Sequence, residues 1–264
     1  MPTTETQKQF IQTQKRSRKR ITLARLALFI LFLLAWETAA GTGQIDPFIF
    51  SSPSRVFRTF LTMWQEEQLA LQIGITLAET LISFFLVVFL SLSLAVLLWL
   101  CPGFARVLEP YLVVLNSLPK SALAPLLIVW LGANMKTIIA AGISVAIFGS
   151  VISLYTSFRE MNPDKLKLIY TLGGTKRHAL FKVILPGSIP YLLSNMKINI
   201  GLCLVGVIIG EFIGARQGLG YLIIYGSQVF RLDMVIMSIV LLCILAMTLY
   251  FLIYFIEKRY HRKL

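Results

Sequence analysis

The stretch KLKLIYTLGGTKRHALFKVILPGSIP, from Lys165 to Pro190, is a basic, patterned segment between two long apolar runs. It contains the pair Gly173-Gly174, and the pair Leu185-Pro186 begins the next apolar run. Connections between helices in compact proteins are mostly only a few residues long. A polar connection of this length predicts an ordered loop that serves as a docking surface for a soluble partner.

The rest of the chain is strongly apolar. Of its 264 residues 57% are hydrophobic, and the mean hydropathy is +0.78. Apolar runs of about 20 residues predict transmembrane helices. We expect an all-α integral membrane protein with six spans, over Leu23–Ala40, Ile73–Leu100, Pro110–Leu131, Thr137–Phe158, Gly187–Phe212 and Val235–Ile256.

Positive charge is concentrated on one side of the predicted spans. With six alternating helices, 18 of the 25 Lys and Arg residues fall on the side of both termini and of the 159–185 loop, and five fall on the other side. Cytoplasmic connections carry such an excess, so we expect both termini and this loop in the cytoplasm. The net charge of +13 follows from this topology and requires no nucleic acid partner.

The chain reads as a single transmembrane domain over residues 23–258, since no linker or low-complexity tract interrupts it. A polar, basic segment precedes this domain over residues 1–22, and its composition predicts disorder. A basic cytoplasmic tail follows over residues 259–264.

Proline interrupts the third predicted span, PYLVVLNSLPKSALAPLLIVWLG, at Pro110, Pro119 and Pro125. A proline inside a helix removes a backbone hydrogen bond and crowds the preceding turn. Membrane helices tolerate this only where neighbouring groups replace the lost bond. We therefore expect a broken or kinked helix inside the bundle, and Pro119 and Pro125 are candidates for the translocation path. The alternative is a purely structural kink.

Four ionisable residues fall within the apolar spans. Lys120 and Lys197 are predicted near the middle of the bilayer, and Glu79 and Glu211 nearer its outer side. A charge at membrane depth is costly and marks a candidate for the translocation path. The lysines could form a cationic patch that attracts an anionic solute. They could instead pair with the glutamates or extend to the membrane surface, and this second interpretation is the simpler one.

The sequence shows no catalytic or metal-binding pattern. His178 and His261 lie in basic stretches without the partners of a triad or a metal site. The three cysteines have no metal-binding spacing, and no glycine-rich nucleotide loop is present. We expect neither an enzymatic activity nor a cofactor bound by this chain, so transport would draw energy from an ion gradient or from another subunit.

A series of short motifs resembles the permease subunits of ATP-binding-cassette (ABC) importers, and within them the nitrate/sulfonate/taurine group. Their order and spacing over about 200 residues carry the resemblance, although Glu79 stands where that group often has Arg. The matching residues are Ser52-Pro53-Ser54, Thr76-Leu77, Leu118-Pro119, Ala122, Pro125-Leu126, Trp130-Leu131-Gly132, Thr171-Leu172-Gly173, Leu185-Pro186, Pro190, Glu211, Gly214 and Gly218-Leu219-Gly220.

The resemblance implies a type I importer permease fold in which the 159–185 loop is the "EAA" coupling loop. Its coupling residues would be Lys167, Leu168, Gly173, Gly174, Leu185 and Pro186. The usual Glu-Ala-Ala falls on Lys167-Leu168-Ile169, so the acidic residue has become basic. Gly173 is expected to allow a sharp turn, and Pro186 is expected to begin the next helix.

The partners implied by the resemblance are two cytoplasmic ABC ATPase subunits that use ATP, an external substrate-binding protein and a second permease copy, most simply in a homodimer. The protein would be a multi-pass component of the bacterial inner membrane. Its solute would be a small anion such as a sulfonate, nitrate or carboxylate, or a small vitamin precursor. The alternative is a stand-alone secondary transporter that uses Glu79 and Glu211 for ion coupling.

Overall fold

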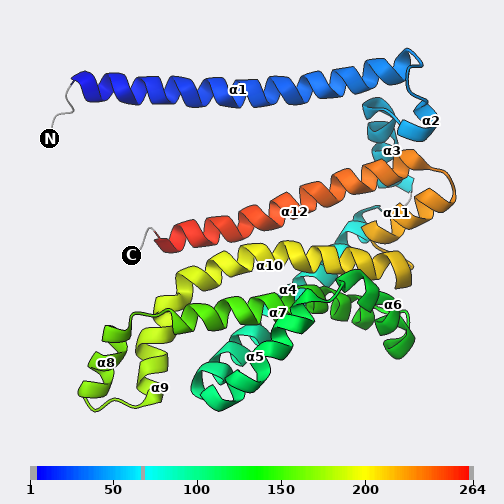
Figure 1. The fold of residues 1–264 in the computed structure, drawn as a ribbon. Helices are drawn as coiled ribbons and strands as arrows, with labels where there is room; N and C mark the ends of the chain where they lie inside the picture. The colour runs from blue at the N-terminus through cyan, green and yellow to red at the C-terminus, as the bar shows by residue number, and fades with distance from the viewer. Residues whose placement is uncertain (1–4, 67–68, 262–264) are drawn as a thin grey trace.

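The computed structural model describes residues 5–66 and 69–261, and within these ranges the chain is helical with no strand (Figure 1). A π-helical turn, Leu180–Ile184, connects α9 to α10. The helices are α1 (Glu5–Gly41), α2 (Pro47–Phe50), α3 (Pro53–Glu66), α4 (Leu69–Leu100), α5 (Pro102–Ser117), α6 (Lys120–Leu131), α7 (Met135–Arg159), α8 (Pro163–Thr171), α9 (Lys176–Ala179), α10 (Leu185–Gly214), α11 (Leu219–Gln228) and α12 (Leu232–His261).

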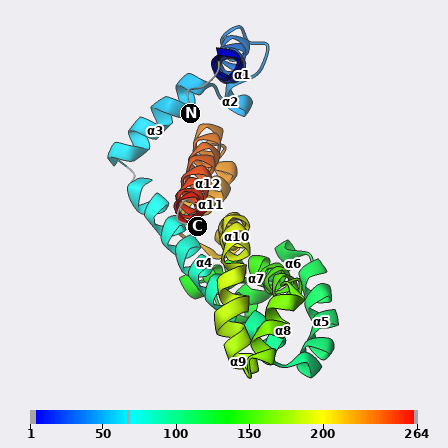
Figure 2. The same cartoon turned by 90° about the vertical axis from the view of Figure 1, so that its left-hand side faces the viewer.

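Helices α4, α7 and α10 form the centre of the bundle (Figure 2), and small residues bring their backbones close together. A Cβ atom built on Gly206 of α10 would lie 2.8 Å from the carbonyl oxygen of Ala141 and 2.8 Å from Cα of Gly142, both on α7. Apolar association gains little in lipid, so close backbone packing of this kind holds membrane helices together. The Gly206-x-x-x-Gly210 pattern thus sets the α7–α10 contact.

The predicted spans are largely confirmed. Among the described residues, five helical segments are long and apolar enough to cross a membrane: Arg20–Gly41, Leu69–Leu100, Met135–Arg159, Lys176–Gly214 and Leu232–Tyr260. The third predicted span is different, because α5 and α6 meet at 97°, a geometry that fits either a broken sixth crossing or a re-entrant loop.

The break between α5 and α6 lies at Leu118-Pro119, whereas Pro110 and Pro125 lie inside intact helices. Pro119 forces an extended conformation on Leu118, which has φ −63° and ψ 142°, and the helix ends there. The sequence therefore predicts an interruption correctly and leaves open which of its prolines causes it.

Helix α1 differs from the expected disordered leader. It begins at Glu5 and runs without interruption to Gly41, so the described part of residues 1–22 has a helical backbone. The reason is local: no Pro or Gly occurs between Glu5 and Gly41, and Gln, Lys and Arg are good helix formers. Residues 262–264 of the predicted tail lie outside the described residues, and α12 covers 259–261.

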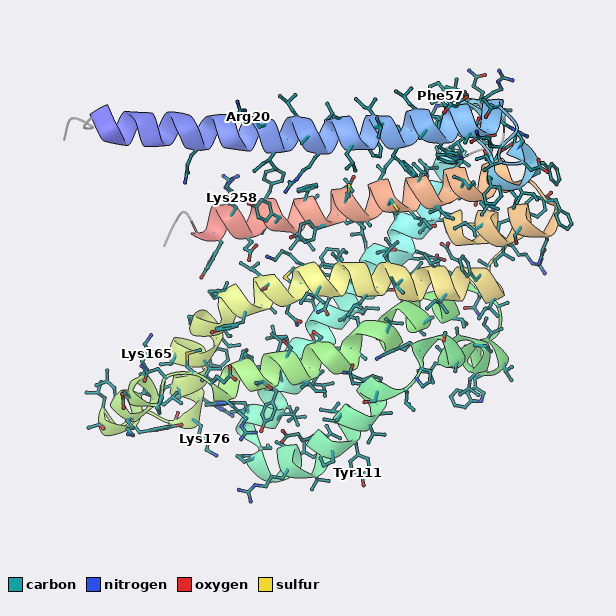
Figure 3. The ribbon with its side chains drawn as sticks, turned by 45° about the horizontal axis from the view of Figure 1, so that its top comes forward. Arg20, Phe57, Tyr111, Lys165, Lys176 and Lys258 are labelled. Atoms are coloured by element: carbon teal, nitrogen blue, oxygen red, sulfur yellow. The ribbon has the colours of Figure 1, made fainter. Side chains whose placement is uncertain are left out.

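The two ends of the bundle differ in what they contain. Both ends of the described chain lie at the same end as α8 and α9, and α2 and α3 lie at the opposite end (Figure 1). Figure 3 shows Lys165, Lys176 and Lys258 together at the first end and Phe57 at the other. We call these the inner and the outer end, following the predicted topology.

Candidate functional sites at the two ends of the bundle

The inner end presents the predicted coupling loop as a short helical hairpin, α8 and α9. The Asn162 side chain caps α8 by accepting a 2.8 Å hydrogen bond from the backbone N–H of Asp164. Gly173 has φ +77°, a conformation that favours glycine, and turns the chain after α8. Thr175 and His178 form a capping box at the start of α9. The glycine turn expected from the sequence is therefore confirmed.

Gly174 is needed for a different reason. A Cβ atom at this position would lie 2.7 Å from the carbonyl oxygen of Ile169 and 2.6 Å from its side chain. The N–H of Gly174 also donates to that same carbonyl. Glycine at position 174 thus lets the turn fold back tightly against the end of α8.

Large apolar side chains are exposed on this basic loop. Leu172 is 76% exposed, and Leu168 and Phe181 are also exposed. Lys167 lies in the same helix as Leu168 and pairs with Asp164 at 3.6 Å, in a solvent-exposed geometry. Clustered apolar residues on a polar surface mark interaction sites.

Pro186 lies in the first turn of α10, which begins at Leu185 as the sequence predicts, although the helical path does not break before it. Segment Lys176–Gly214 is continuous, and Pro186 lies inside it. The π-helical turn just before Pro186 carries a wider hydrogen bond, from the N–H of Leu185 to the carbonyl of Leu180. This extra residue in the turn accommodates a proline that would otherwise crowd the preceding turn. Leu185 is partly buried and packs against a buried apolar cluster that contains Phe158 and Ile184, so it is not an exposed docking residue.

The outer end contains a buried network around Glu211 of α10. One carboxylate oxygen accepts a 2.6 Å hydrogen bond from the Thr76 hydroxyl, and the other accepts a 2.6 Å bond from the N–H of Gly220. The Thr76 oxygen in turn accepts from the N–H of Leu219 at 2.8 Å. These bonds satisfy the N–H groups of Leu219 and Gly220 at the start of α11, which have no partner within the helix.

Gly218 and Gly220 fit around the same carboxylate. A Cβ atom on Gly218 would lie 2.3 Å from Oε1 of Glu211, and one on Gly220 would lie 2.7 Å from Oε2. The N–H of Gly218 also donates a 2.6 Å hydrogen bond to Oε1 of Gln72. The Gly218-Leu219-Gly220 motif therefore has a structural explanation: it lets the loop wrap the Glu211 side chain.

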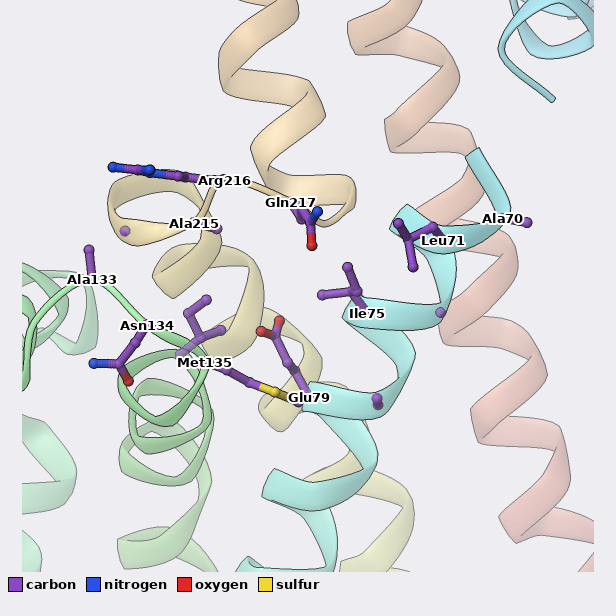
Figure 4. A pocket seen from close by; sticks show the side chains of 14 residues that line it. Ala70, Leu71, Ile75, Glu79, Ala133, Asn134, Met135, Ala215, Arg216 and Gln217 are labelled. Atoms are coloured by element: carbon purple, nitrogen blue, oxygen red, sulfur yellow. The ribbon is translucent and has the colours of Figure 1, made fainter. Parts of the chain in front are cut away.

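Next to this network is a cavity of about 480 Å³ at the outer end, the outer pocket (Figure 4). Glu79 faces it from α4, is 2% exposed, and has its carboxyl group against that of Glu211. One oxygen of Glu79, Oε2, has no hydrogen-bond partner. The pocket is lined by Ala70, Leu71, Gly74, Ile75, Ala78, Glu79, Ala133, Asn134, Met135, Ile138, Gly214, Ala215, Arg216 and Gln217.

The two membrane lysines do not pair with Glu79 or Glu211. Lys197 forms a 2.7 Å ion pair with Glu257 of α12, and both side chains are largely buried. Lys120 is the first residue of α6 and donates to the backbone carbonyl of Asn116, one of the carbonyls left free where α5 ends. Pairing within the bundle is thus correct for Lys197, with a different partner from the one expected.

The structure places only some of the six candidates for the translocation path at the outer pocket. Glu79 lines the outer pocket, and Glu211 lies directly behind it. Pro119, Lys120, Pro125 and Lys197 do not line this pocket.

Sequence reasoning missed a second buried polar cluster, in the middle of the bundle. The Ser150 hydroxyl of α7 accepts 2.8 Å hydrogen bonds from the side-chain amides of Asn195 and Asn199 and donates to Ser91 at 2.9 Å. Four described polar side chains thus join α4, α7 and α10. Two asparagines spaced four residues apart in an apolar span were the available signal.

The comparisons with known proteins match this architecture. Residues 102–263 match the family model described as "Binding-protein-dependent transport system inner membrane component". The chain belongs to this family. It is a multi-pass inner-membrane permease of the ABC importer type. This membership decides between the two transporter classes that the sequence left open, against a stand-alone secondary transporter.

Curated relatives match most of the chain, from 73% to 90% of its length. A probable ABC transporter permease protein of Haemophilus influenzae is 28% identical over 242 residues, 90% of this chain and 96% of the relative. The formylaminopyrimidine transport permease protein of Halalkalibacterium halodurans is 28% identical over 73% of this chain and 76% of its own length. The taurine transport system permease protein of Escherichia coli is 25% identical over 88% and 86%.

Solved structures agree on the fold. A chain of the MetNI methionine ABC transporter in an inward-facing conformation superimposes with a TM-score of 0.62 and 23% identity, over 75% of this chain and 98% of that one. A chain of a bacterial alginate ABC transporter superimposes with a TM-score of 0.60 and 16% identity, over 93% and 96%. The expected type I importer permease fold is confirmed.

Proposed function

We propose that this permease works in a homodimer whose α8–α9 loops each dock on one of two cytoplasmic ATPase subunits. The observation that carries the proposal is the exposure of three large apolar residues, Leu168, Leu172 and Phe181, on an otherwise basic loop. This loop lies at the end of the bundle that also holds both ends of the described chain, the side to which the charge distribution assigns the cytoplasm.

ATP hydrolysis in the partner would move the loop, and the continuous helix from Lys176 to Gly214 would carry that movement to the outer end. The permease would then alternate between inward- and outward-open states. An external binding protein would deliver the solute at the outer end. The relatives named for taurine and formylaminopyrimidine transport favour a small, polar solute of the sulfonate or vitamin-precursor kind.

Leu172→Asp tests the docking surface. The side chain is exposed, so the charge leaves the permease folded but places an unpaired charge in an apolar contact. We expect loss of co-purification with the ATPase subunits and loss of solute-stimulated ATP hydrolysis, with the permease still inserted in the membrane.

Phe230→Asp is the matched control. Phe230 is similarly exposed, at 67%, lies between α11 and α12 at the outer end, and has φ +56°, which Asp tolerates well. This variant should keep the ATPase bound. Normal co-purification of Leu172→Asp, or equal loss in both variants, contradicts the docking role.

A further inference from the structure

We propose that the outer pocket is a solute-binding site of the permease, in which Glu79 accepts a hydrogen bond from an amino or ammonium group of the solute. The inference rests on the proposed function, because it assigns a substrate class to a transporter. It names a site on the permease itself, and the ligand chemistry is a small solute that carries an N–H donor.

The first argument is that two neighbouring buried carboxyl groups differ in their hydrogen bonds. Both oxygens of Glu211 are engaged by its own chain, through Thr76 and Gly220. Glu79 is equally buried and shares a side-chain hydrogen bond with Glu211, yet its Oε2 has no partner among the described residues. A buried acceptor without a donor loses its hydration with no compensation, and native structures rarely keep one without a reason. A ligand donor supplies that reason.

The second argument is charge. The ion pairs of the described residues involve neither Glu79 nor Glu211, and Lys120 and Lys197 are engaged elsewhere. Buried carboxyl groups in proteins are normally compensated by a cation or by several hydrogen bonds. Since the described chain supplies no cation to this pair, a cationic or N–H-bearing group of the solute would fit the charge of the site.

The third argument is the shape and lining of the pocket. Its volume of about 480 Å³ suits a small molecule, and ligand pockets are commonly apolar with a few polar groups that fix orientation. Here Leu71 and Ile75 form apolar wall, and Gln217 and Arg216 lie at the outer side of the pocket (Figure 4). A solute with nitrogen at one end and a polar or anionic group at the other would bind with its nitrogen towards Glu79.

Access to Glu79 requires one movement. The carboxyl group is buried, and the Met135 side chain extends towards it in Figure 4. Methionine is unbranched and adapts its shape easily, so displacement of this side chain by a solute is inexpensive. Met135 itself is 44% exposed, which leaves it room to move.

A reporter cysteine at position 74 tests the proposal. Gly74 lines the pocket, and a Cβ atom there would meet no atom within 4 Å, so Gly74→Cys adds a thiol without a clash. The native Cys101, Cys203 and Cys243 are replaced by alanine. The labelling rate by a membrane-impermeant maleimide is measured in right-side-out vesicles that contain the permease with its ATPase subunits.

The probes are 2-aminoethanesulfonate and ethanesulfonate, which differ only by the amino group. We expect the aminated probe to slow labelling of Gly74→Cys, about fourfold at three times its dissociation constant, and ethanesulfonate to have little effect. Glu79→Gln should abolish the protection. Gly41→Cys, an exposed position at the outer end that does not line the pocket, should show no protection by either probe.

Three results would overturn the proposal: no protection by the aminated probe, equal protection by both probes, or unchanged protection in Glu79→Gln. The comparison of the two probes needs no Glu79 variant, so it tests the proposal even if that variant fails to fold. Co-purification of the ATPase from the same vesicles reports on the proposed function separately. ATPase retained without protection rejects this site alone, and protection without bound ATPase rejects the docking loop alone.

Discussion

The outer end of this permease buries polar side chains, whereas its inner loop exposes apolar ones. At the outer end, Glu211 and Thr76 are buried and hydrogen-bonded to the loop that begins α11. At the inner end, the α8–α9 hairpin leaves Leu172 and its apolar neighbours exposed. The Glu211 network at the outer end is therefore formed by contacts within the chain, whereas the inner loop carries the surface that we propose docks on a partner.

This difference separates residues that stabilise the folded permease from residues that would couple it to the ATPase. A substitution in the outer network removes contacts that exist in the permease alone, so it should lower the free energy of unfolding. A substitution of an exposed side chain in the inner loop should remove only the contacts proposed for the assembled transporter, so it should spare the permease and disrupt the assembly. The four predictions below test this separation, from the largest expected effect to the smallest.

Gly218→Ala should destabilise the permease most. The added Cβ would lie 2.3 Å from Oε1 of Glu211, and φ +108° is a conformation that alanine rarely adopts. Backbone strain and overpacking together predict a loss of about 4 kcal/mol in the free energy of unfolding. Thermal unfolding in detergent measures it. Gly201→Ala, where a Cβ meets no atom within 4 Å, is the control and should be neutral or slightly stabilising.

Lys197→Met should also destabilise, by about 3 kcal/mol, because it leaves Glu257 buried without its partner. The double variant Lys197→Met/Glu257→Gln should recover part of the loss. A double-mutant cycle on unfolding in detergent gives the coupling energy. Additive effects of the two single substitutions would show that this pair contributes no coupling energy to stability.

Gly173→Val should lower stability by about 1–2 kcal/mol, through the positive φ at that position, and should abolish ATPase binding. The readouts are unfolding in detergent and co-purification with the ATPase. Gly103→Val, at an open position near the inner end, should retain the ATPase. A Gly173→Val permease that unfolds before it loses the ATPase would mean that the loop belongs to the folded core.

Lys120→Met should have the smallest effect, below about 1 kcal/mol, because only a hydrogen bond to the carbonyl of Asn116 is lost. Uptake of an anionic solute should be nearly normal, since Lys120 does not line the outer pocket. A large loss of anion uptake with normal stability would revive the anion path that the sequence left open for this residue.

The sequence predicts local features well. Long apolar runs, the glycine turn at Gly173 and the interruption of the third predicted span all depend on nearby residues, and the structure bears them out. The helical start of the chain at Glu5 was also local, and it was missed because a polar composition was interpreted as disorder. Helix propensity alone argued for the observed structure.

Long-range partners were beyond the reach of the sequence. Nothing in the chain near Lys197 points to Glu257, which lies 60 residues away on another helix. The same holds for Glu211 and Gln72, which contact one loop from two helices. Local sequence also does not decide what a proline does. Pro119 ends a helix, whereas Pro186 is accommodated in a continuous helical path by a π-helical turn.

The unbroken helix from Lys176 to Gly214 fixes the rotation of its two ends relative to each other. One end carries the basic hairpin, and near the other Glu211 holds the N–H of Gly220. Each residue of an α-helix turns the chain by about 100°. A single residue inserted within 187–210 would thus swing the carboxylate away from its loop, whereas the same insertion between α8 and α9 would leave that angle unchanged. The number of residues in this helix therefore fixes the angle between the hairpin at one end and the Glu211 carboxyl group near the other.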